Sequence, residues 1–384
     1  MRARTLLATG TLLAGLGAGS AIVMLPPSDT RDAAAAPPAI PEQEQQALIA
    51  ALKPPKHAVP VVAVLGLNRG TETTDYVVPY GVLRASGLAE VVALATEPGR
   101  LHLMPALTLD AGATIADFDA RHPDGADYVI VPAMHDPSDP TVASWIRSQA
   151  AKGATIVGIC AGARVLAHAG LLRGRSGTTH WYELAALRNE EPRMRWARNR
   201  RYVADRGVVT TTGVTASIPV SLAIVEAIGG RAPAEALAHE IGVERWDAAH
   251  DSDAFRLDRR SVLTAAGNTL AFWSHETVGI PVASGVDEIA LALTADAYSR
   301  TYRSRALAVA ADSAPLQTRR GLTIVPDETT SDHVDVRLDA VPSERPATVL
   351  DAALRAIAGR YGSPTATFVA LQLEYPRVAD ARGD

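Results

Sequence analysis

The sequence predicts an α/β protein: a parallel sheet sandwiched by helices, followed by a second, smaller α/β lobe. Three observations support this fold class. Short valine-rich runs alternate with helical patterns from residue 59 to about residue 250, an order typical of parallel strands joined by helices. Those runs are apolar at nearly every position, as in strands buried on both faces. Similar elements continue beyond residue 261.

The elements of the first domain, residues 59–250, follow in order. A polar turn at residues 68–74 separates the first strand from the first helix, and Gly153 ends the helix over residues 141–152. The predicted strands are residues 59–67, 91–95, 128–132, 155–159 and 208–212. The other helices are expected just after residue 74 and over residues 161–169 and 218–228.

The second lobe is expected over residues 261–384. Its predicted elements are a strand at 289–293, a helix at 296–303 and a strand at 307–310. Residues 306–329 repeat the order of strand, polar hairpin and extended run found in residues 91–114, and residues 345–362 are similar to residues 216–233. We interpret the lobe as a truncated, degenerate repeat that lacks the cysteine segment. Chance similarity between two α/β segments is the alternative.

The N-terminal segment has the pattern of a targeting or anchoring sequence. Arg2 and Arg4 precede an uncharged run over residues 5–25, close to the roughly 20 residues that span a bilayer as a helix. Residues 1–26 are therefore predicted to be either an uncleaved membrane anchor or a signal peptide. Both alternatives place the remaining chain outside the cytoplasm. Residues 27–58 are predicted to be a flexible linker with one short helix at 42–52.

Composition narrows the function. The chain has 384 residues, 47% hydrophobic and 21% charged, with a net charge of −5, which excludes disorder over most of its length and gives no electrostatic reason to bind nucleic acid. Its one cysteine, Cys160, excludes an internal disulfide and a Cys-rich zinc site.

Cys160 lies in a motif that suits a nucleophile. In Gly158-Ile159-Cys160-Ala161-Gly162 the glycines allow a strand to turn sharply into a helix, with the thiol raised at the turn. The N-terminus of the following helix would favour the thiolate and lower the pKa. The alternative is a buried cysteine that only fills space.

These motifs resemble the DJ-1/PfpI superfamily, with its class I glutamine amidotransferase-like, flavodoxin-like fold. The resemblance covers about residues 59–250 and is nearest to the amidase-like domain of GlxA/AraC-type regulators and to isonitrile hydratase. The motifs that carry it are Cys160-Ala161-Gly162-Ala163, residues 166–172 (LAHAGLL), Gly174-Arg175 and Thr178-Thr179-His180-Trp181.

The resemblance implies partners for the thiol. Asp75, ahead of a proline on the first helix, matches the family's acidic residue, with Glu72 as second choice and helix capping as the alternative role of Asp75. His180 matches a histidine that some members use as a base, and a purely structural histidine is the alternative.

The oxyanion or substrate pocket is expected around Ala133, Met134, Ala161 and Gly162. Ala133-Met134 stands where family members usually carry Gly-Gly, so the anion pocket is expected to be narrower or misaligned.

The leading hypothesis is a cysteine-dependent hydrolase or hydratase outside the cytoplasm, acting on a small amide, nitrile-like or aldehyde substrate. Cys160 would be the nucleophile, Asp75 the acid/base and His180 a base or orienting group, with no cofactor and no metal. The alternatives are a non-catalytic small-ligand or oxidation sensor and a structural pseudo-enzyme. The expected partners are a small molecule and, through the N-terminus, a membrane, without nucleic acid. Family members commonly dimerise, so a homodimer is also an expectation.

Overall fold

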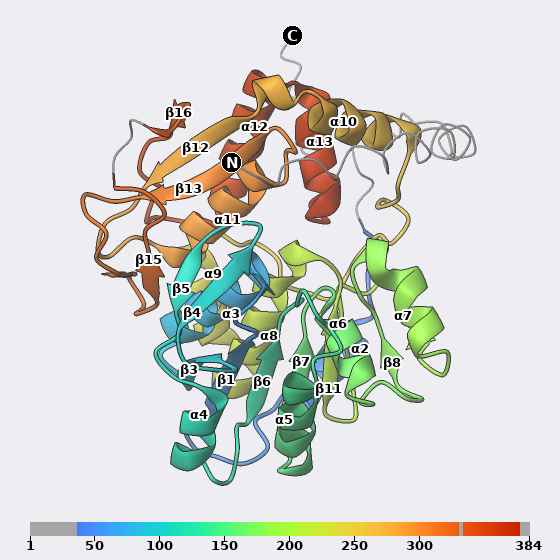
Figure 1. Ribbon diagram of the computed structural model, residues 1–384. Coiled ribbons are helices and arrows are strands. Elements are labelled where there is room, and N and C mark those ends of the chain that lie inside the picture. The colour runs from blue at the N-terminus through green and yellow to red at the C-terminus, as the bar shows by residue number, and fades with distance from the viewer. Residues whose placement is uncertain (1–36, 330–332, 377–384) are drawn as a thin grey trace.

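A six-stranded sheet forms the centre of the first half of the computed structural model, which describes residues 37–329 and 333–376 (Figure 1). The strand order is β10-β11-β7-β6-β1-β3, parallel except where β10 pairs antiparallel with β11. The strands are β1 (Val61–Gly66), β3 (Glu90–Ala95), β6 (Tyr128–Val131), β7 (Thr155–Gly158), β10 (Tyr202–Asp205) and β11 (Val208–Thr211). This is the flavodoxin-like α/β fold that the sequence predicts.

Helices cover both faces of this sheet because its strands are apolar on both sides. Val62 and Val64 belong to one hydrophobic cluster, whereas Val61 and Ala63 belong to another, as the twofold alternation of a strand requires. The helices of this half are α2 (Glu42–Ala51), α3 (Thr73–Ser86), α4 (Ile115–Arg121), α5 (Pro140–Ala151), α6 (Gly162–His168), α7 (Leu184–Glu190), α8 (Ser217–Gly229) and α9 (Arg231–Ile241).

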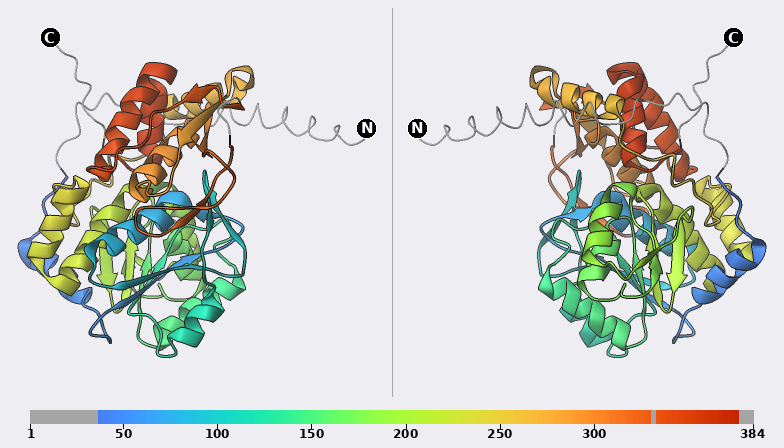
Figure 2. Two further views of the ribbon diagram at one scale, coloured as in Figure 1. Left: turned by 90° about the vertical axis from the view of Figure 1, so that its left-hand side faces the viewer. Right: turned by 90° about the vertical axis from the view of Figure 1, so that its right-hand side faces the viewer.

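The second half contains a smaller parallel sheet with the order β13-β12-β16. Its strands are β12 (Glu276–Pro281), β13 (Ser304–Val309) and β16 (Val336–Arg337), and its helices are α10 (Arg259–Leu270), α11 (Glu288–Ser299), α12 (Val349–Tyr361) and α13 (Ser363–Gln372). Both views of Figure 2 show this half seated on one end of the first. One hydrophobic cluster includes buried residues of both halves.

A third sheet joins the two halves. Its order is β14-β15-β5-β4-β2, and β15 pairs antiparallel with β5. The strands are β2 (Thr71–Glu72), β4 (Arg100–Met104), β5 (Thr108–Asp110), β14 (Leu316–Gln317) and β15 (Thr323–Val325). A separate pair, β8 (Ser176–Gly177) and β9 (Arg195–Trp196), lies between α6 and β10 in the chain.

Two predictions about local structure are wrong: the strand at residues 289–293, and the bounds of the helix at residues 296–303, because the helix observed there, α11, begins at Glu288 and ends at Ser299. Residues 289–293, predicted as a strand, lie inside α11, where Asp287 caps the helix by accepting the Ile289 and Ala290 amides. All but one of the residues in this helix are buried, and an apolar run buried on all sides has no period that separates helix from strand. The strand preceding it, β12, was missed.

The described part of the predicted linker packs on the first half and is not a free tether. The Leu52 side chain is fully buried, and its carbonyl accepts a hydrogen bond from the Tyr128 hydroxyl. Arg200 forms a bidentate ion pair with Glu44 on α2. The predicted anchor or signal peptide, residues 1–26, lies outside the described residues. Within the described ranges, no helix is long and apolar enough to cross a membrane.

Candidate active site

Cys160 occupies a strained turn between β7 and α6. Its φ is +56°, a left-handed conformation that is rare for a residue with a side chain. The turn is held by neighbouring threonines: the Cys160 amide donates to Thr211 Oγ1 (3.1 Å), and Thr179 Oγ1 donates to the Cys160 carbonyl (3.0 Å). This is the sharp strand-to-helix turn of a nucleophile elbow.

Gly162 is required by close packing in the same turn. A Cβ at this position would lie 2.1 Å from the Val131 carbonyl oxygen, far inside van der Waals contact. The glycine therefore lets the start of α6 approach the end of β6. Ala161, between the glycine and the thiol, is half-buried.

The thiol is more enclosed than expected. Only 7% of Cys160 is exposed. Burial raises the pKa of the thiol well above its usual value, the carboxyls of Asp75, Glu72 and Glu374 raise it further, and the Ala161 amide opposes the shift. The expectation of a lowered pKa is therefore wrong, because desolvation and nearby carboxyls outweigh the N-terminus of α6.

Asp75 faces this site from the first turn of α3. Its Oδ2 accepts the Ala133 amide (3.1 Å), and its buried Oδ1 has no hydrogen-bond partner among the described residues. Burial and the neighbouring Glu72 raise the pKa of Asp75 well above its usual value. A carboxyl with a raised pKa and an unpaired oxygen is a candidate for exchanging a proton with a neighbouring group.

Glu72 caps the N-terminus of α3, and this role distinguishes it from Asp75, the other acidic candidate. Its Oε2 accepts the Asp75 amide at 2.6 Å, and both of its oxygens accept the Thr74 hydroxyl. Its Oε1 also accepts Arg300 Nη2 at 2.7 Å. Because Glu72 caps α3, Asp75 is free of the capping role that was its alternative.

Arg300 comes from the second half and is bound by two carboxyls. Its Nε donates to Asp296 Oδ1 at 2.7 Å while Nη2 binds Glu72. Burial raises the pKa of Asp296 to about 8, against the opposing charge of Arg300. The buried cation offsets part of the negative charge gathered beside the thiol.

The segment in place of the usual Gly-Gly pair pairs with the start of α3. The Ala133 amide binds Asp75, and its carbonyl accepts the Glu72 amide at 2.8 Å. Met134 forms a β-bridge with Thr71, and its side chain is buried in a hydrophobic cluster. The Ala133 amide thus orients the acid in this structure.

His180 has backbone partners for both ring nitrogens. Nε2 donates to the Gln372 carbonyl (2.9 Å), and Nδ1 accepts the Tyr182 amide (3.3 Å). Burial lowers the pKa of His180 to about 4, so the ring is neutral at neutral pH. These contacts fit the orienting or structural role rather than that of a base.

Glu374 completes the site and was missed in the sequence. It accepts the Trp181 amide at 2.7 Å and also binds the Gly213 amide. Burial raises its pKa to about 7. No local motif marks Glu374, which lies more than 200 residues beyond Cys160 in the sequence and just after α13.

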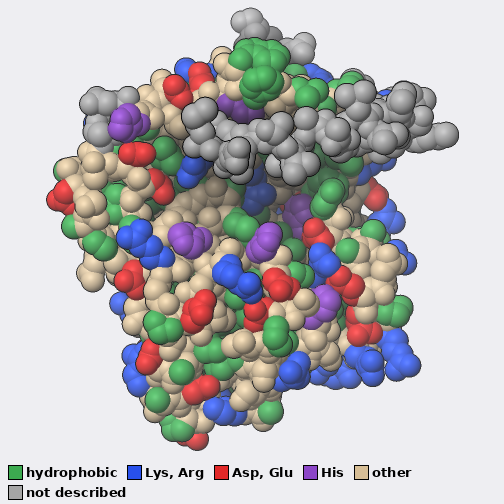
Figure 3. All heavy atoms as spheres, viewed as in Figure 1, with side chains coloured by type: hydrophobic (Ala, Val, Ile, Leu, Met, Phe, Trp, Pro, Cys, Tyr) green, Lys and Arg blue, Asp and Glu red, His purple; other side chains and the backbone are tan. Residues whose placement is uncertain are grey.

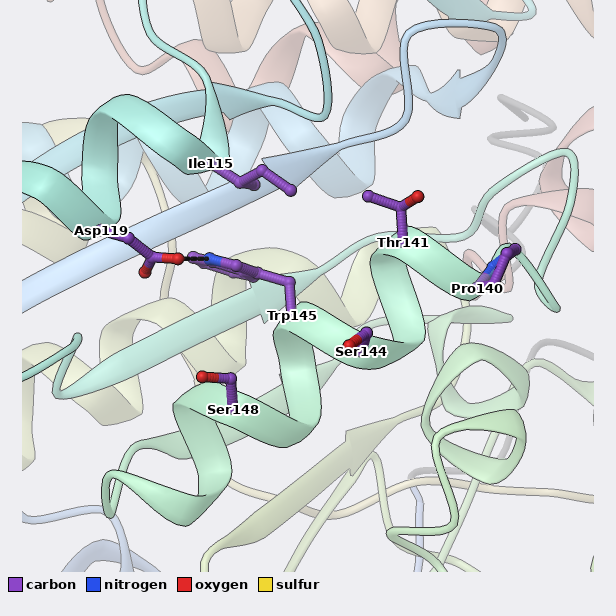
Figure 4. Close-up of a pocket in the computed structure, with 7 residues that line it drawn as sticks. All are labelled: Ile115, Asp119, Pro140, Thr141, Ser144, Trp145 and Ser148. Atoms are coloured by element: carbon purple, nitrogen blue, oxygen red, sulfur yellow. Dashed lines mark hydrogen bonds between the residues drawn. The ribbon is translucent and has the colours of Figure 1, made fainter.

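The face seen in Figure 3 is hollowed between the two halves, with basic and histidine side chains gathered along the hollow. A separate depression lies on the outer side of the first half, between α4 and α5 (Figure 4). There Trp145 Nε1 donates to Asp119 Oδ2 at 3.1 Å. None of the predicted site residues lines it.

Comparisons with known proteins match mainly the first half of the chain. The model of the DJ-1/PfpI family matches residues 61–227, which include Asp75, Cys160 and His180. Isonitrile hydratase of Pseudomonas putida is 34% identical over 94 residues, 24% of this chain and 39% of that protein. The HTH-type transcriptional regulator GlxA of Rhizobium meliloti (strain 1021) is 31% identical over 148 residues, 38% of this chain and 44% of that protein.

The extent of the matches differs between relatives. The chain spans less than half the length of isonitrile hydratase and GlxA. It spans 87% of an uncharacterized protein in the cpoL 5′ region of Streptomyces lividans, at 31% identity over 123 residues, or 29% of this chain. A solved DJ-1 superfamily protein from Salmonella typhimurium is 24% identical, with a TM-score of 0.43 over 49% of this chain and 100% of that one.

Proposed function

The chain belongs to the DJ-1/PfpI family, and from this premise we propose that it is a cysteine-dependent hydrolase or hydratase for a small, uncharged electrophile. The observation that carries the proposal is an elbow thiol close enough to Asp75 to feel its charge, while one buried oxygen of that carboxyl has no hydrogen-bond partner among the described residues. The substrate class is an amide, a nitrile-like compound or an aldehyde. The enclosed thiol and surrounding carboxyls disfavour bulky and anionic substrates.

The proposed reaction begins with proton transfer from Cys160 to Asp75. Asp75 is the acceptor that the geometry offers, because its Oδ1 has no hydrogen-bond partner among the described residues. The sulfur then forms a bond to the electrophilic carbon, and Asp75 returns the proton to the substrate heteroatom. With an amide, the protonated amine departs and leaves a thioester; with a nitrile-like compound, the product of thiol addition is a thioimidate. Water then attacks the same carbon, the C–S bond breaks, the acid or the amide is released, and the sulfur is protonated again. With an aldehyde, thiol addition gives a hemithioacetal.

A substrate screen tests this proposal. Wild type is assayed against small amides, nitriles, isonitriles and aldehydes beside Cys160→Ser and Asp75→Asn. We expect turnover of at least one class that Cys160→Ser abolishes. Turnover that survives in Cys160→Ser, or no thiol-dependent turnover in any class, would contradict the enzymatic proposal.

An oxidation sensor is the second candidate. It is favoured by the backbone near the thiol: the Ala133 amide binds Asp75, and the Gly162 amide donates to the Ile159 carbonyl. Two of the four residues expected around the oxyanion pocket therefore have amides that are already bonded. A sensor would gain one or two oxygen atoms on Cys160 after mild peroxide, with no turnover. If the protein shows neither oxidation of Cys160 nor turnover, the structural pseudo-enzyme is the hypothesis that remains.

We also propose that the folded halves lie outside the cytoplasm. The support is the uncharged run of residues 5–25 behind Arg2 and Arg4. The mass of the N-terminus of the mature protein separates a cleaved signal peptide from a retained anchor, and recovery of the whole chain in the cytosol would contradict both.

A further inference from the structure

The two halves repeat the same order of elements. In the first half, β1 and β3 are parallel neighbours connected through α3, and β6 lies on the other side of β1. In the second half, β12 and β13 are parallel neighbours connected through α11, and β16 lies on the other side of β12. A hairpin follows each second strand, and a helix pair closes each half: α8 and α9, or α12 and α13.

At the interface between the halves, equivalent elements contact each other as they do across a twofold axis. The equivalent hairpin strands β5 and β15 pair antiparallel, with Leu109 opposite Ile324, as equivalent strands must across such an axis. Helices α3 and α11 pack together across the same interface.

Equivalent residues of α3 and α11 also lie against the start of the opposite helix. Gly81 and Asp296 both lie nine residues after the cap of their helix. A Cβ on Gly81 would lie 2.7 Å from Ile289 at the start of α11, and Asp296 interacts with Glu72 at the start of α3. The contacts to the hairpins correspond as well: Thr73 Oγ1 donates to the Ala106 carbonyl, and Glu288, also the first residue after its cap, accepts the Arg320 amide.

The second half has no thiol, and its contacts converge on the thiol of the first. Gln372 connects them, because its carbonyl accepts His180 Nε2 and its Nε2 donates to the Arg300 carbonyl. From there Arg300 reaches Glu72, the cap that binds the Asp75 amide. On the other side of the thiol, Glu374 binds the Gly213 amide and the Thr212 side chain. The neighbouring residue, Thr211, accepts the Cys160 amide through its hydroxyl oxygen.

We infer that residues 276–376 act as an internal partner: a thiol-free copy, docked across a local twofold axis, that supplies Arg300 and Glu374 as positioning residues for Cys160. The inference rests on the proposed function only in assigning importance to Cys160. It replaces the expected homodimer with one chain in which the partner is covalently attached, and it predicts a monomer whose site is complete.

Glu374 gives the inference a measurable signature. The charged and titratable groups around it are Cys160, Arg201 and His180, and the thiol is also influenced by Asp75, Glu72 and Arg300. Ionisation of Glu374 places a negative charge near the thiolate and disfavours it. The reaction of Cys160 with iodoacetamide should therefore respond to a second titration close to neutral pH.

The test compares full-length wild type with Glu374→Gln and Arg320→Gln. Arg320 binds Asp287 and Glu288 at the start of α11, so its variant removes a buried cation from the same interface away from the thiol. The rate of Cys160 alkylation is measured from about pH 5 to about pH 10, and the mass in solution is measured by light scattering.

We expect a monomer, and alkylation of Glu374→Gln that is faster by about threefold to tenfold at the alkaline end and loses the step near neutral pH. Arg320→Gln should keep the wild-type profile. The inference is overturned if Glu374→Gln also keeps that profile, if either variant accelerates alkylation equally at every pH, or if wild type dimerises through the α3 face. Substrate turnover is not measured, so failure here is distinct from failure of the proposed enzyme.

Discussion

Two helices begin at the same interface and differ in what they support. At the start of α3, Glu72 caps the helix and Asp75 faces the thiol; at the start of α11, Asp287 caps the helix and the position of Asp75 holds Ala290. Both caps are buried and both are bound by an arginine of the second half, since Arg300 binds Glu72 and Arg320 binds Asp287. The second half thus supplies one arginine to each helix start.

The difference teaches that the local architecture does not by itself create the site. A capped helix, a parallel crossover and a hairpin are present in both halves. The first half alone adds β7 and the elbow that follows it. The elbow places Cys160 near Asp75, one oxygen of which has no hydrogen-bond partner among the described residues. The second half keeps the packing surface and carries no thiol.

The largest expected effect comes from comparing two separate substitutions: one of the acid Asp75 in α3 and one of Asp287, the cap of α11. Asp75→Asn should lower Cys160-dependent turnover by about 100-fold or more, because the amide cannot take the thiol proton. Asp287→Asn should leave turnover within about twofold while lowering the free energy of unfolding. Steady-state kinetics and urea denaturation measure both. Equal losses of turnover would remove the functional asymmetry.

The elbow gives the next largest effect. Gly162→Ala places a Cβ 2.1 Å from the Val131 oxygen, and both groups belong to the backbone or are fixed to it. We expect the free energy of unfolding to fall by about 3 kcal/mol or more. Urea denaturation followed by circular dichroism checks this value, and a loss below about 1 kcal/mol would mean that the approach of α6 to β6 is not tight.

A change of similar size is expected in how the free energy of unfolding depends on pH, and it is specific to Glu374. The ionised form of Glu374 is disfavoured in the folded state, since its pKa rises from 4.5 to about 7. Its contribution therefore reduces stability as the pH rises from about 4.5 to about 7. The stability of Glu374→Gln relative to wild type should increase by about 3 kcal/mol over this interval.

The comparison between the two proteins isolates Glu374. His180, whose pKa is lowered to about 4, acts with the opposite sign and stabilises the folded state as pH rises through about 4 to 6.5, but it is present in both proteins. Thermal or urea denaturation across the range measures the difference. A difference that does not change with pH would show that Glu374 keeps an ordinary pKa.

The smallest effect concerns a glycine in the second half. Gly267 lies inside α10, and in the part of the chain that the structure describes no atom outside that helix's own backbone lies within 4 Å of the place a Cβ would take. Gly267→Ala should raise the free energy of unfolding by about 0.5–1 kcal/mol, because alanine favours helix. It provides the counterpart of Gly162→Ala, and denaturation that shows a loss would place a neighbour where none is described.

The sequence predicts the first half well because its signals are local. Valine runs, the glycines around Cys160 and the break at Gly153 all act within a few residues. The fold and the family follow from them. Residues 289–293 were assigned to the wrong element because α11 is buried on every side, and local periodicity then carries no information.

The site is predicted only where a motif marks it. Cys160 and Asp75 lie in recognisable patterns, whereas Arg300 and Glu374 reach the site from the second half by tertiary packing alone. The raised pKa of the thiol could not be foreseen for the same reason, since burial and carboxyls from distant parts of the chain determine it.

The ladder between β5 and β15 has a consequence for synthesis of the chain. Asp110 pairs with Thr323, so the outer edge of the β4–β5 hairpin emerges from the ribosome more than two hundred residues before the strand that covers it. At about 5–20 residues per second, that edge waits for at least about 10 s with unpaired amides and carbonyls. Nascent chains stopped within this interval should be the ones most prone to aggregate or to recruit chaperones.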